Sequence, residues 1–216
     1  SDNYETTIFK PMISKIEEIS GKKYGENKKE MRIIADHLRA ATFVLGDEHG
    51  IKPSNAGQGY VLRRLIRRAI RYGRVLGIEG SFIDKIAEVV IGEYEDYPEL
   101  QANKDFVLAE LRKEEERFGK TLLKGLGKLK EFISITRQIS GKNAFLMFQS
   151  YGFPIEMIIE IAREREANVD VAGFDEEMRK HQELSRSSSA GMFKSGLADD
   201  SERTVRLHTA THLLNE

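Results

Sequence analysis

The sequence feature that most constrains this chain is a run of arginines between Tyr60 and Arg74. The segment reads YVLRRLIRRAIRYGR and holds six arginines and no acidic residue. At about 100° per residue in an α-helix, the arginines fall within an arc of roughly 140°, and apolar side chains fill the opposite side. We therefore predict an amphipathic helix with one face on a core and one face that is positively charged throughout.

Such a face needs anions beside it, because like charges at i,i+4 destabilise an isolated helix. One source is intramolecular: the acidic runs Glu114–Glu116 and Glu93–Asp96 could neutralise some of the arginines. The other is a phosphate backbone, whose oxygens match the fork of a guanidinium group. The two interpretations can hold for different arginines, so the sequence leaves both open.

The composition limits the class of protein further. Across 216 residues the net charge is −1, so a nucleic-acid surface must come from local clustering of cations. The chain has no cysteine, which excludes disulfides and thiolate metal sites. No stretch approaches the ~20 apolar residues of a membrane span, and no signal peptide opens the chain. We expect a cytoplasmic protein that does not enter a membrane.

The hydrophobic spacing predicts a predominantly all-α fold in two helical parts, residues 1–138 and 139–188, followed by a linker and the start of a further domain over 189–216. Ser185–Ser189 is expected as a short non-helical linker. Arg203–Asn215 reads as the start of a helix whose leucines have no partner, which suggests a piece of a longer protein. Helices are expected at about residues 2–21, 31–45, 60–76, 82–94, 104–132, 144–148, 154–166 and 173–184.

Several motifs, in one order along nearly the whole chain, resemble a known family. PSNAGQGYVLRRLIRR at Pro53–Arg68 closely resembles the middle, tRNA-recognition region of alanyl-tRNA synthetases. Further matching segments are SDNYETTIF at Ser1–Phe9, RIIADHLRAATF at Arg32–Phe43, SGKNAF at Ser140–Phe145, YGFP at Tyr151–Pro154 and LHTATHLLNE at Leu207–Glu216, the last resembling the opening of the editing domain.

The resemblance implies that this region grips a tRNA acceptor stem and checks a G·U wobble pair near its end. Asn55 matches the family asparagine that faces this pair, and its carbonyl can accept from the guanine amino group in the wide minor groove of RNA. Without the resemblance, Asn55 would read as an ordinary turn or capping residue. The arginines expected to contact the RNA backbone are Arg63, Arg64, Arg67, Arg68 and Arg71.

The second reader of the wobble pair departs from the family. The family usually carries an aspartate two residues before the tyrosine that matches Tyr151, and this chain has Gln149 there. A neutral amide oxygen accepts a weaker hydrogen bond than a carboxylate does. The resemblance therefore implies weaker discrimination, or discrimination supplied in another way.

No catalytic residue and no cofactor are predicted for this chain. The family's ATP- and alanine-binding motifs are not found in it, so ATP with Mg²⁺ and a zinc ion of the editing domain are expected of the parent protein. His208 and His212 lie four residues apart and match zinc ligands of that domain; they form half a site, expected to be empty. His37 is expected to be a core histidine.

The partners implied are an alanine-specific tRNA and the aminoacylation and editing domains of the parent chain. Two alternatives remain open at this point. One is a fragment of the editing domain that hydrolyses mischarged tRNA through His208 and His212. The other is a helical protein-interaction bundle whose basic face meets an acidic partner.

Overall fold

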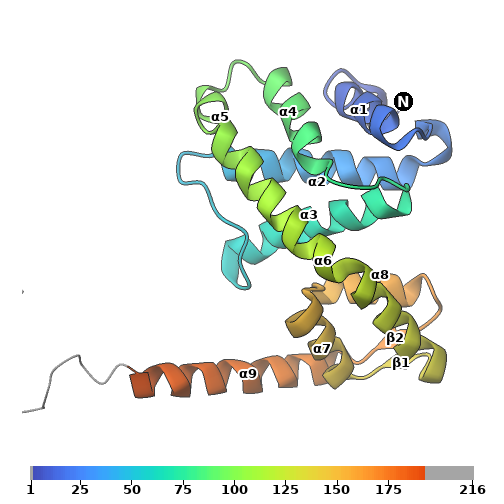
Figure 1. The fold of residues 1–216 in the computed structure, drawn as a ribbon, viewed down its shortest axis with the longest axis vertical. Helices are drawn as coiled ribbons and strands as arrows, with labels where there is room; N and C mark the ends of the chain where they lie inside the picture. The colour runs from blue at the N-terminus through green and yellow to red at the C-terminus, as the bar shows by residue number, and fades with distance from the viewer. Residues whose placement is uncertain (1, 193–216) are drawn as a thin grey trace, which may run out of the picture.

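The computed structural model describes residues 2–192, with the side chains of residues 187–192 left out, and most of this part is helical (Figure 1). This confirms the predicted all-α class. The helices are α1 (Lys10–Ser20), α2 (Lys28–Gly46), α3 (Gly57–Val75), α4 (Ile83–Glu93), α5 (Pro98–Ala102), α6 (Lys104–Thr136), α7 (Gly141–Tyr151), α8 (Ile155–Arg163) and α9 (Val171–Met192), with short 3-10 turns η1 (Asn3–Glu5) and η2 (Tyr24–Glu26).

Helices α1 to α5 and the first half of α6 surround the larger part of the core. The apolar sides of α2 and α3 face each other, and Leu38, Leu62 and Ile66 are almost completely buried there. Glu115 of α6 fixes the start of α4, because its carboxylate accepts hydrogen bonds from the Phe82 N–H at 3.1 and 3.2 Å. It thereby satisfies a backbone donor that α4 itself leaves unpaired.

Helix α6 is shared by both parts of the molecule, since its second half continues past the first core and packs against α7 (Figure 1). The rings of Phe118 and Phe153 meet edge to face at 5.5 Å, and both are buried. Gly125 leaves the space that the Phe153 ring fills. The predicted division near residue 138 falls just after α6, but residues in the second half of α6 help to form the core of the smaller part.

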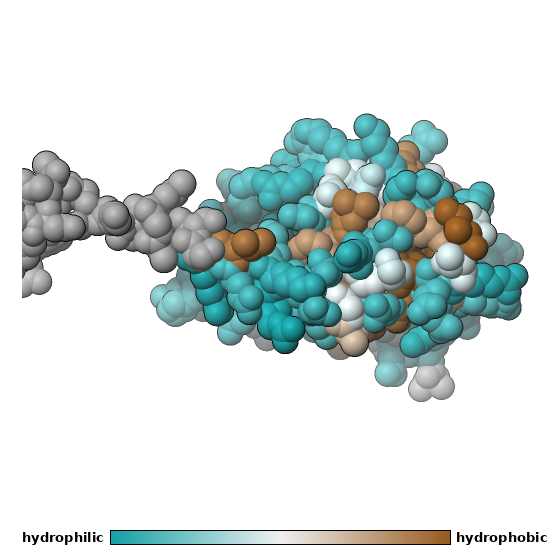
Figure 2. Space-filling view, turned by 90° about the horizontal axis from the view of Figure 1, so that it is seen from below, coloured by the Kyte–Doolittle hydropathy of each residue, from teal (hydrophilic) through white to brown (hydrophobic). Residues whose placement is uncertain are grey.

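The smaller part contains two short strands that the sequence analysis did not predict. β1 (Gln138–Ile139) and β2 (Asn168–Val169) pair in parallel, with Gln138 opposite Asn168. Helix α9 extends away from this end of the molecule (Figure 1). From below, the surface is mainly hydrophilic with hydrophobic side chains among the polar ones (Figure 2), and α7 and α9 expose Leu146 and Leu184 by 38% and 67%.

The predicted linker at Ser185–Ser189 is wrong, because α9 continues through these residues as far as Met192. Polar composition alone predicts a break, but the stretch contains neither proline nor glycine, the residues that interrupt a helix most strongly. The helix expected at Arg203–Asn215 lies outside the described residues. Within the described part, no helix is both long enough and apolar enough to cross a membrane.

Candidate nucleic-acid interface

The charged side of α3 faces carboxylates of this same chain. Arg63, Arg67 and Arg71 are only 7%, 5% and 5% exposed. Each forms an ion pair with a glutamate of α6 or α8. The intramolecular interpretation therefore holds for part of the helix, with Glu114 as one of the predicted partners. None of these partners comes from Glu93–Asp96.

Glu114 of α6 binds two of the arginines at once. Its Oε1 atom lies 2.6 Å from both Nε and Nη2 of Arg67 and 3.2 Å from Nε of Arg63. The Arg63 Nε contact is an ion pair without hydrogen-bond geometry. Burial lowers the pKa of the Arg67 guanidinium, while the attraction of Glu114 opposes this and the repulsion of Arg63 adds to it. The triad thus holds two positive charges and one negative charge inside the protein.

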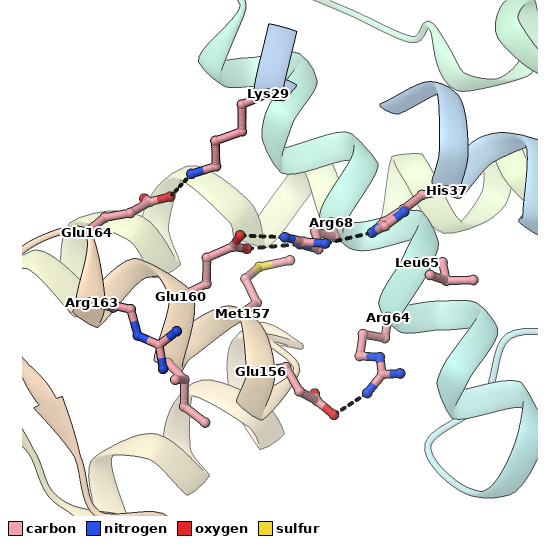
Figure 3. Close-up of a pocket in the computed structure, with 11 residues that line it drawn as sticks. Lys29, His37, Arg64, Leu65, Arg68, Glu156, Met157, Glu160, Arg163 and Glu164 are labelled. Atoms are coloured by element: carbon pink, nitrogen blue, oxygen red, sulfur yellow. Dashed lines mark hydrogen bonds and ion pairs between the residues drawn. The ribbon is translucent and has the colours of Figure 1, made fainter. Parts of the chain in front are cut away.

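Helix α8 and the residue that caps its end, Glu164, supply the other carboxylates, in a row whose spacing matches that of the α3 arginines. Their spacing at i, i+4 and i+8 places them on one side of α8. Figure 3 shows two of these contacts across the pocket between the helices. The α3–α8 ion pairs are Arg64 with Glu156 at 2.6 Å, Arg68 with Glu160 at 2.7 Å, and Arg71 with Glu160 at 3.3 Å and with Glu164.

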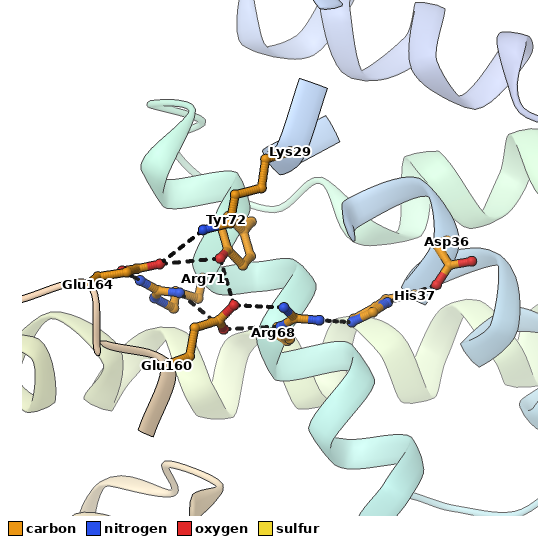
Figure 4. Close-up of polar contacts among 8 residues, drawn as sticks. All are labelled: Lys29, Asp36, His37, Arg68, Arg71, Tyr72, Glu160 and Glu164. Atoms are coloured by element: carbon orange, nitrogen blue, oxygen red, sulfur yellow. Dashed lines mark hydrogen bonds and ion pairs between the residues drawn. The ribbon is translucent and has the colours of Figure 1, made fainter. Parts of the chain in front are cut away.

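We call this row of α3–α8 ion pairs the seam. Its middle pair, Arg68 with Glu160, makes the most hydrogen bonds. Arg68 donates from Nε and Nη2 to the two oxygens of Glu160, and the Tyr72 hydroxyl donates to Oε1 at 2.8 Å (Figure 4). Burial alone would raise the pKa of Glu160, but the hydrogen bonds from Arg68 and Tyr72 outweigh it, and the pKa lies below the ordinary value. Glu160 therefore stays ionised at neutral pH and holds the two helices together.

His37 joins the same network from α2. Its Nε2 accepts from Arg68 Nη1 at 2.9 Å, which leaves the proton on Nδ1 to donate to Asp36 Oδ2 at 3.2 Å (Figure 4). Burial lowers the pKa of His37, and the positive charge of Arg68 lowers it further. The ring is therefore neutral at pH 7 and acts as a hydrogen-bonding link in the seam. The pocket it borders has a volume of about 600 Å³ and is lined mainly by these paired charges.

The two predicted base readers line a different pocket, of about 320 Å³. Asn55 comes from the loop before α3, and Gln149 comes from the last turns of α7; both residues are exposed. Arg63 orients the first of them, because its Nη1 donates to Asn55 Oδ1 and its Nη2 donates to the Pro53 carbonyl at 3.1 Å. The structure thus brings together two polar amides that are far apart in the sequence.

Other residues of this pocket were missed by sequence reasoning. Arg117 of α6 and His181 of α9 line it together with Asn55 and Gln149. The His181 ring lies 5.5 Å from the ring of Phe145, centroid to centroid. Arg117 follows three glutamates and looks in the sequence like an ordinary solvated charge. Only the fold places it beside the pocket.

No group of three or more metal-ligating side chains occurs among the residues that the structure describes. His208 and His212 lie outside those residues. The seam and the pocket therefore offer hydrogen bonds and charge, which are the means of recognising a polar ligand.

Comparison with known proteins identifies the family. The family model described as tRNA synthetases class II (A) matches residues 1–215. The chain is 48% identical over 225 residues to an alanine–tRNA ligase of Borrelia hermsii (strain HS1 / DAH), which covers all of this chain and 37% of the relative. It is 46% identical to the alanine–tRNA ligase of Treponema pallidum (strain Nichols), covering 99% and 37% of the two chains, and 44% identical to that of Pediococcus pentosaceus, covering 92% and 23%.

The chain thus spans 37% of the length of the first two of these relatives, and the similarity runs along nearly all of its own length. The matched region includes every motif that carried the resemblance noted above. The chain belongs to the class II (A) family of tRNA synthetases.

Proposed function

We propose that this chain is the tRNA-recognition part of an alanine–tRNA ligase, and that it reads a G·U wobble pair of the acceptor stem with Asn55 and Gln149. The observation that carries the proposal is that these two residues, from the loop before α3 and from α7, line one pocket. The similarity to alanine–tRNA ligases along the chain supports the choice of tRNA. Aminoacylation itself, with ATP and Mg²⁺, and editing with zinc would belong to the longer parent protein.

The contact between Arg63 and Asn55 suits base recognition. A carbonyl oxygen has two lone pairs, and Arg63 uses one of those on Asn55 Oδ1. The amide is then held with its second lone pair available to the guanine amino group in the minor groove. Gln149 presents a second amide across the same pocket, so the two side chains can test the pair from two positions.

The five arginines expected to hold the RNA backbone divide into two groups by exposure. The side chains of Arg64 and Arg68 are 36% and 33% exposed, so they can reach a phosphate without leaving the protein surface. The other three are themselves buried and would have to leave their paired carboxylates first, which costs several kcal/mol for each broken buried pair. In this proposal Arg63, Arg67 and Arg71 hold the recognition elements in place, while Arg64 and Arg68 remain candidates for direct phosphate contact.

The test compares two acceptor-stem hairpins that differ only in G·U or G·C at the recognition position. Binding by fluorescence anisotropy is expected to favour the G·U stem and to weaken steeply with salt. Asn55→Ala should remove the preference while keeping binding to both stems. Asn168→Ala, at an exposed asparagine of β2, serves as the matched control and should keep the preference.

Three outcomes would reject parts of the proposal. Equal affinity for both stems, unchanged in the Asn55 variant, would exclude base readout and leave only phosphate binding. Absence of binding even at low salt would favour the protein-interaction bundle instead. Stoichiometric tight zinc together with deacylase activity would favour an editing fragment.

A further inference from the structure

Helix α6 carries a row of cations on one side. The residues recur every three or four positions, and at about 100° per residue they fall within an arc of roughly 80°. No acidic residue lies inside this arc between the first and the last of them. We call this row the α6 basic stripe; it consists of Lys113, Arg117, Lys120, Lys124 and Lys128.

The stripe is accessible, unlike the buried arginines of α3. Arg117 and Lys124 are exposed, and within the described part of the chain no carboxylate lies within ion-pair distance of either. Lys113, Lys120 and Lys128 pair with glutamates of the same helix, three or four residues away. Exposed pairs of this kind are weak and screened by salt, so a phosphate can displace them.

The stripe is continuous with the pocket of Asn55 and Gln149. Arg117 belongs to both, and Thr121, one turn further along α6, also lines the pocket. Thr121 lies next to the stripe on the helix, on the side toward the core. At a rise of about 1.5 Å per residue, the row from Lys113 to Lys128 extends roughly 22 Å, which is enough to meet phosphates of several consecutive nucleotides.

We propose that the α6 basic stripe is the main phosphate-binding surface for the RNA whose base pair is read at the pocket. The inference rests on the proposed function and changes where the backbone is held: on α6, beside the pocket, more than on α3. An acidic protein would also be attracted to such a row. RNA is favoured because the row passes a pocket, at Arg117, that offers two amides and the rings of Phe145 and Phe148, which are groups that recognise bases.

The experiment uses the double variant Arg117→Gln with Lys124→Gln, which removes two charges while keeping similar side chains. Its matched control is Lys85→Gln with Lys104→Gln, two exposed lysines of α4 and α6 outside the stripe, with the same change in net charge. Binding of the G·U and G·C stems is measured from about 50 to 200 mM salt. All four substitutions are at exposed positions, and thermal denaturation checks that each variant is folded.

The stripe variant is expected to weaken binding of both stems to the same extent, on the order of 10-fold, and to lower the salt slope by about two, one for each phosphate that the variant no longer binds. The preference for G·U should be unchanged, because phosphate contacts carry no sequence information. The control should keep both the affinity and the slope.

A salt slope that is equal in the stripe variant and the control would overturn the stripe while leaving the proposed function intact. Absence of a G·U preference in the wild type would instead reject base readout, and a reduced slope in the variant would still support the stripe. Polyglutamate that binds the wild type as tightly as the RNA does, but does not bind the stripe variant, would overturn the assignment to RNA in favour of an acidic protein.

Discussion

Replacing Glu114 by glutamine tests whether the α3 arginines depend on internal carboxylates. The Glu114 side chain is 4% exposed, and its single negative charge faces Arg63 and Arg67, whose side chains are 9% and 7% exposed. Glutamine keeps the size and one acceptor oxygen but leaves two buried guanidinium groups without a counter-charge. Arginine does not lose its proton within proteins, so the charges cannot be removed by titration.

Removing one partner of a buried ion pair destabilises a protein by about 3–5 kcal/mol. In a chain of this size each kcal/mol lowers Tm by roughly 2–4 °C, so Glu114→Gln should melt about 6–20 °C below the wild type. The measurement is thermal unfolding followed by circular dichroism at pH 7, with urea unfolding to obtain the free energy. A drop of this size with an unchanged m-value would indicate reduced stability without a change of the unfolded state.

The matched control is Glu116→Gln, two residues away on the same helix. Glu116 and its partner Lys120 are 71% and 70% exposed, and an i,i+4 pair of this kind contributes about 0.3–0.5 kcal/mol. The control should therefore melt within about 2 °C of the wild type. If the two variants have the same Tm, the guanidinium groups of Arg63 and Arg67 are solvated and do not need Glu114 as a counter-charge.

Three further predictions concern packing, pH and specificity. Gly125→Ala should destabilise the fold by about 1–3 kcal/mol, because the new Cβ would lie 2.8 Å from Phe153 Cζ and closer still to Cε2. Its control, Gly127→Ala, places the new Cβ with no atom within 4 Å and should stabilise the fold by about 0.5–1 kcal/mol. Urea unfolding that ranks the two variants the other way would contradict this packing. Burial and a neighbouring guanidinium hold the pKa of His37 below 6.5, so its contribution to stability is present above pH 6.5 and is lost as the pH falls through the lowered value. His37→Gln should therefore flatten the dependence of Tm on pH in that range. An unchanged dependence would reject a role for His37 in stability. Gln149→Asp should increase the ratio of G·U to G·C stem affinity, because a carboxylate accepts a stronger hydrogen bond than an amide; an unchanged ratio would mean that Gln149 does not contact the pair.

Apart from the short α5 and the last turns of α9, the helices could be predicted from the sequence because each has a clear apolar side. The arginine run was correctly interpreted as an amphipathic helix, and the acidic run Glu114–Glu116 was correctly proposed as an internal counter-charge. The carboxylates of Glu156, Glu160 and Glu164 were not predicted as partners, although their four-residue spacing matches that of the arginines. Charge spacing shows that two helix faces are complementary, but not that the chain brings those helices together.

The strands β1 and β2 could not be predicted for a different reason. Each has two residues, which is too short for an alternating pattern, and their parallel pairing joins segments on either side of α7 and α8. Asn55 and Gln149 were singled out through the resemblance to a family. Nothing in their local sequence indicates that they share a pocket, since one is in a loop and the other is on the exposed side of a helix.

The positions of Asn55 and Gln149 both depend on one buried carboxylate. Glu114 binds Arg63, whose guanidinium holds Asn55 Oδ1, and it also binds Arg67. Arg67 in turn donates from Nη1 to the carbonyl of Gly152, which directly follows the helix that carries Gln149. The loop before α3 and the end of α7 are thus both held by the Glu114 carboxylate, one through Arg63 and the other through Arg67.

This arrangement explains why the two α3 arginines that line the pocket, Arg63 and Arg67, are buried. Two amide side chains can distinguish G·U from G·C only if the distance between the amides is fixed, because amides free to move would adapt to either base pair. Three charged groups buried together resist such adjustment, since separating any of them exposes an uncompensated charge in the protein interior. Within the proposed function, Arg63 and Arg67 therefore serve specificity by holding the readers apart at a constant distance, and the exposed cations of α6 remain free to bind phosphate.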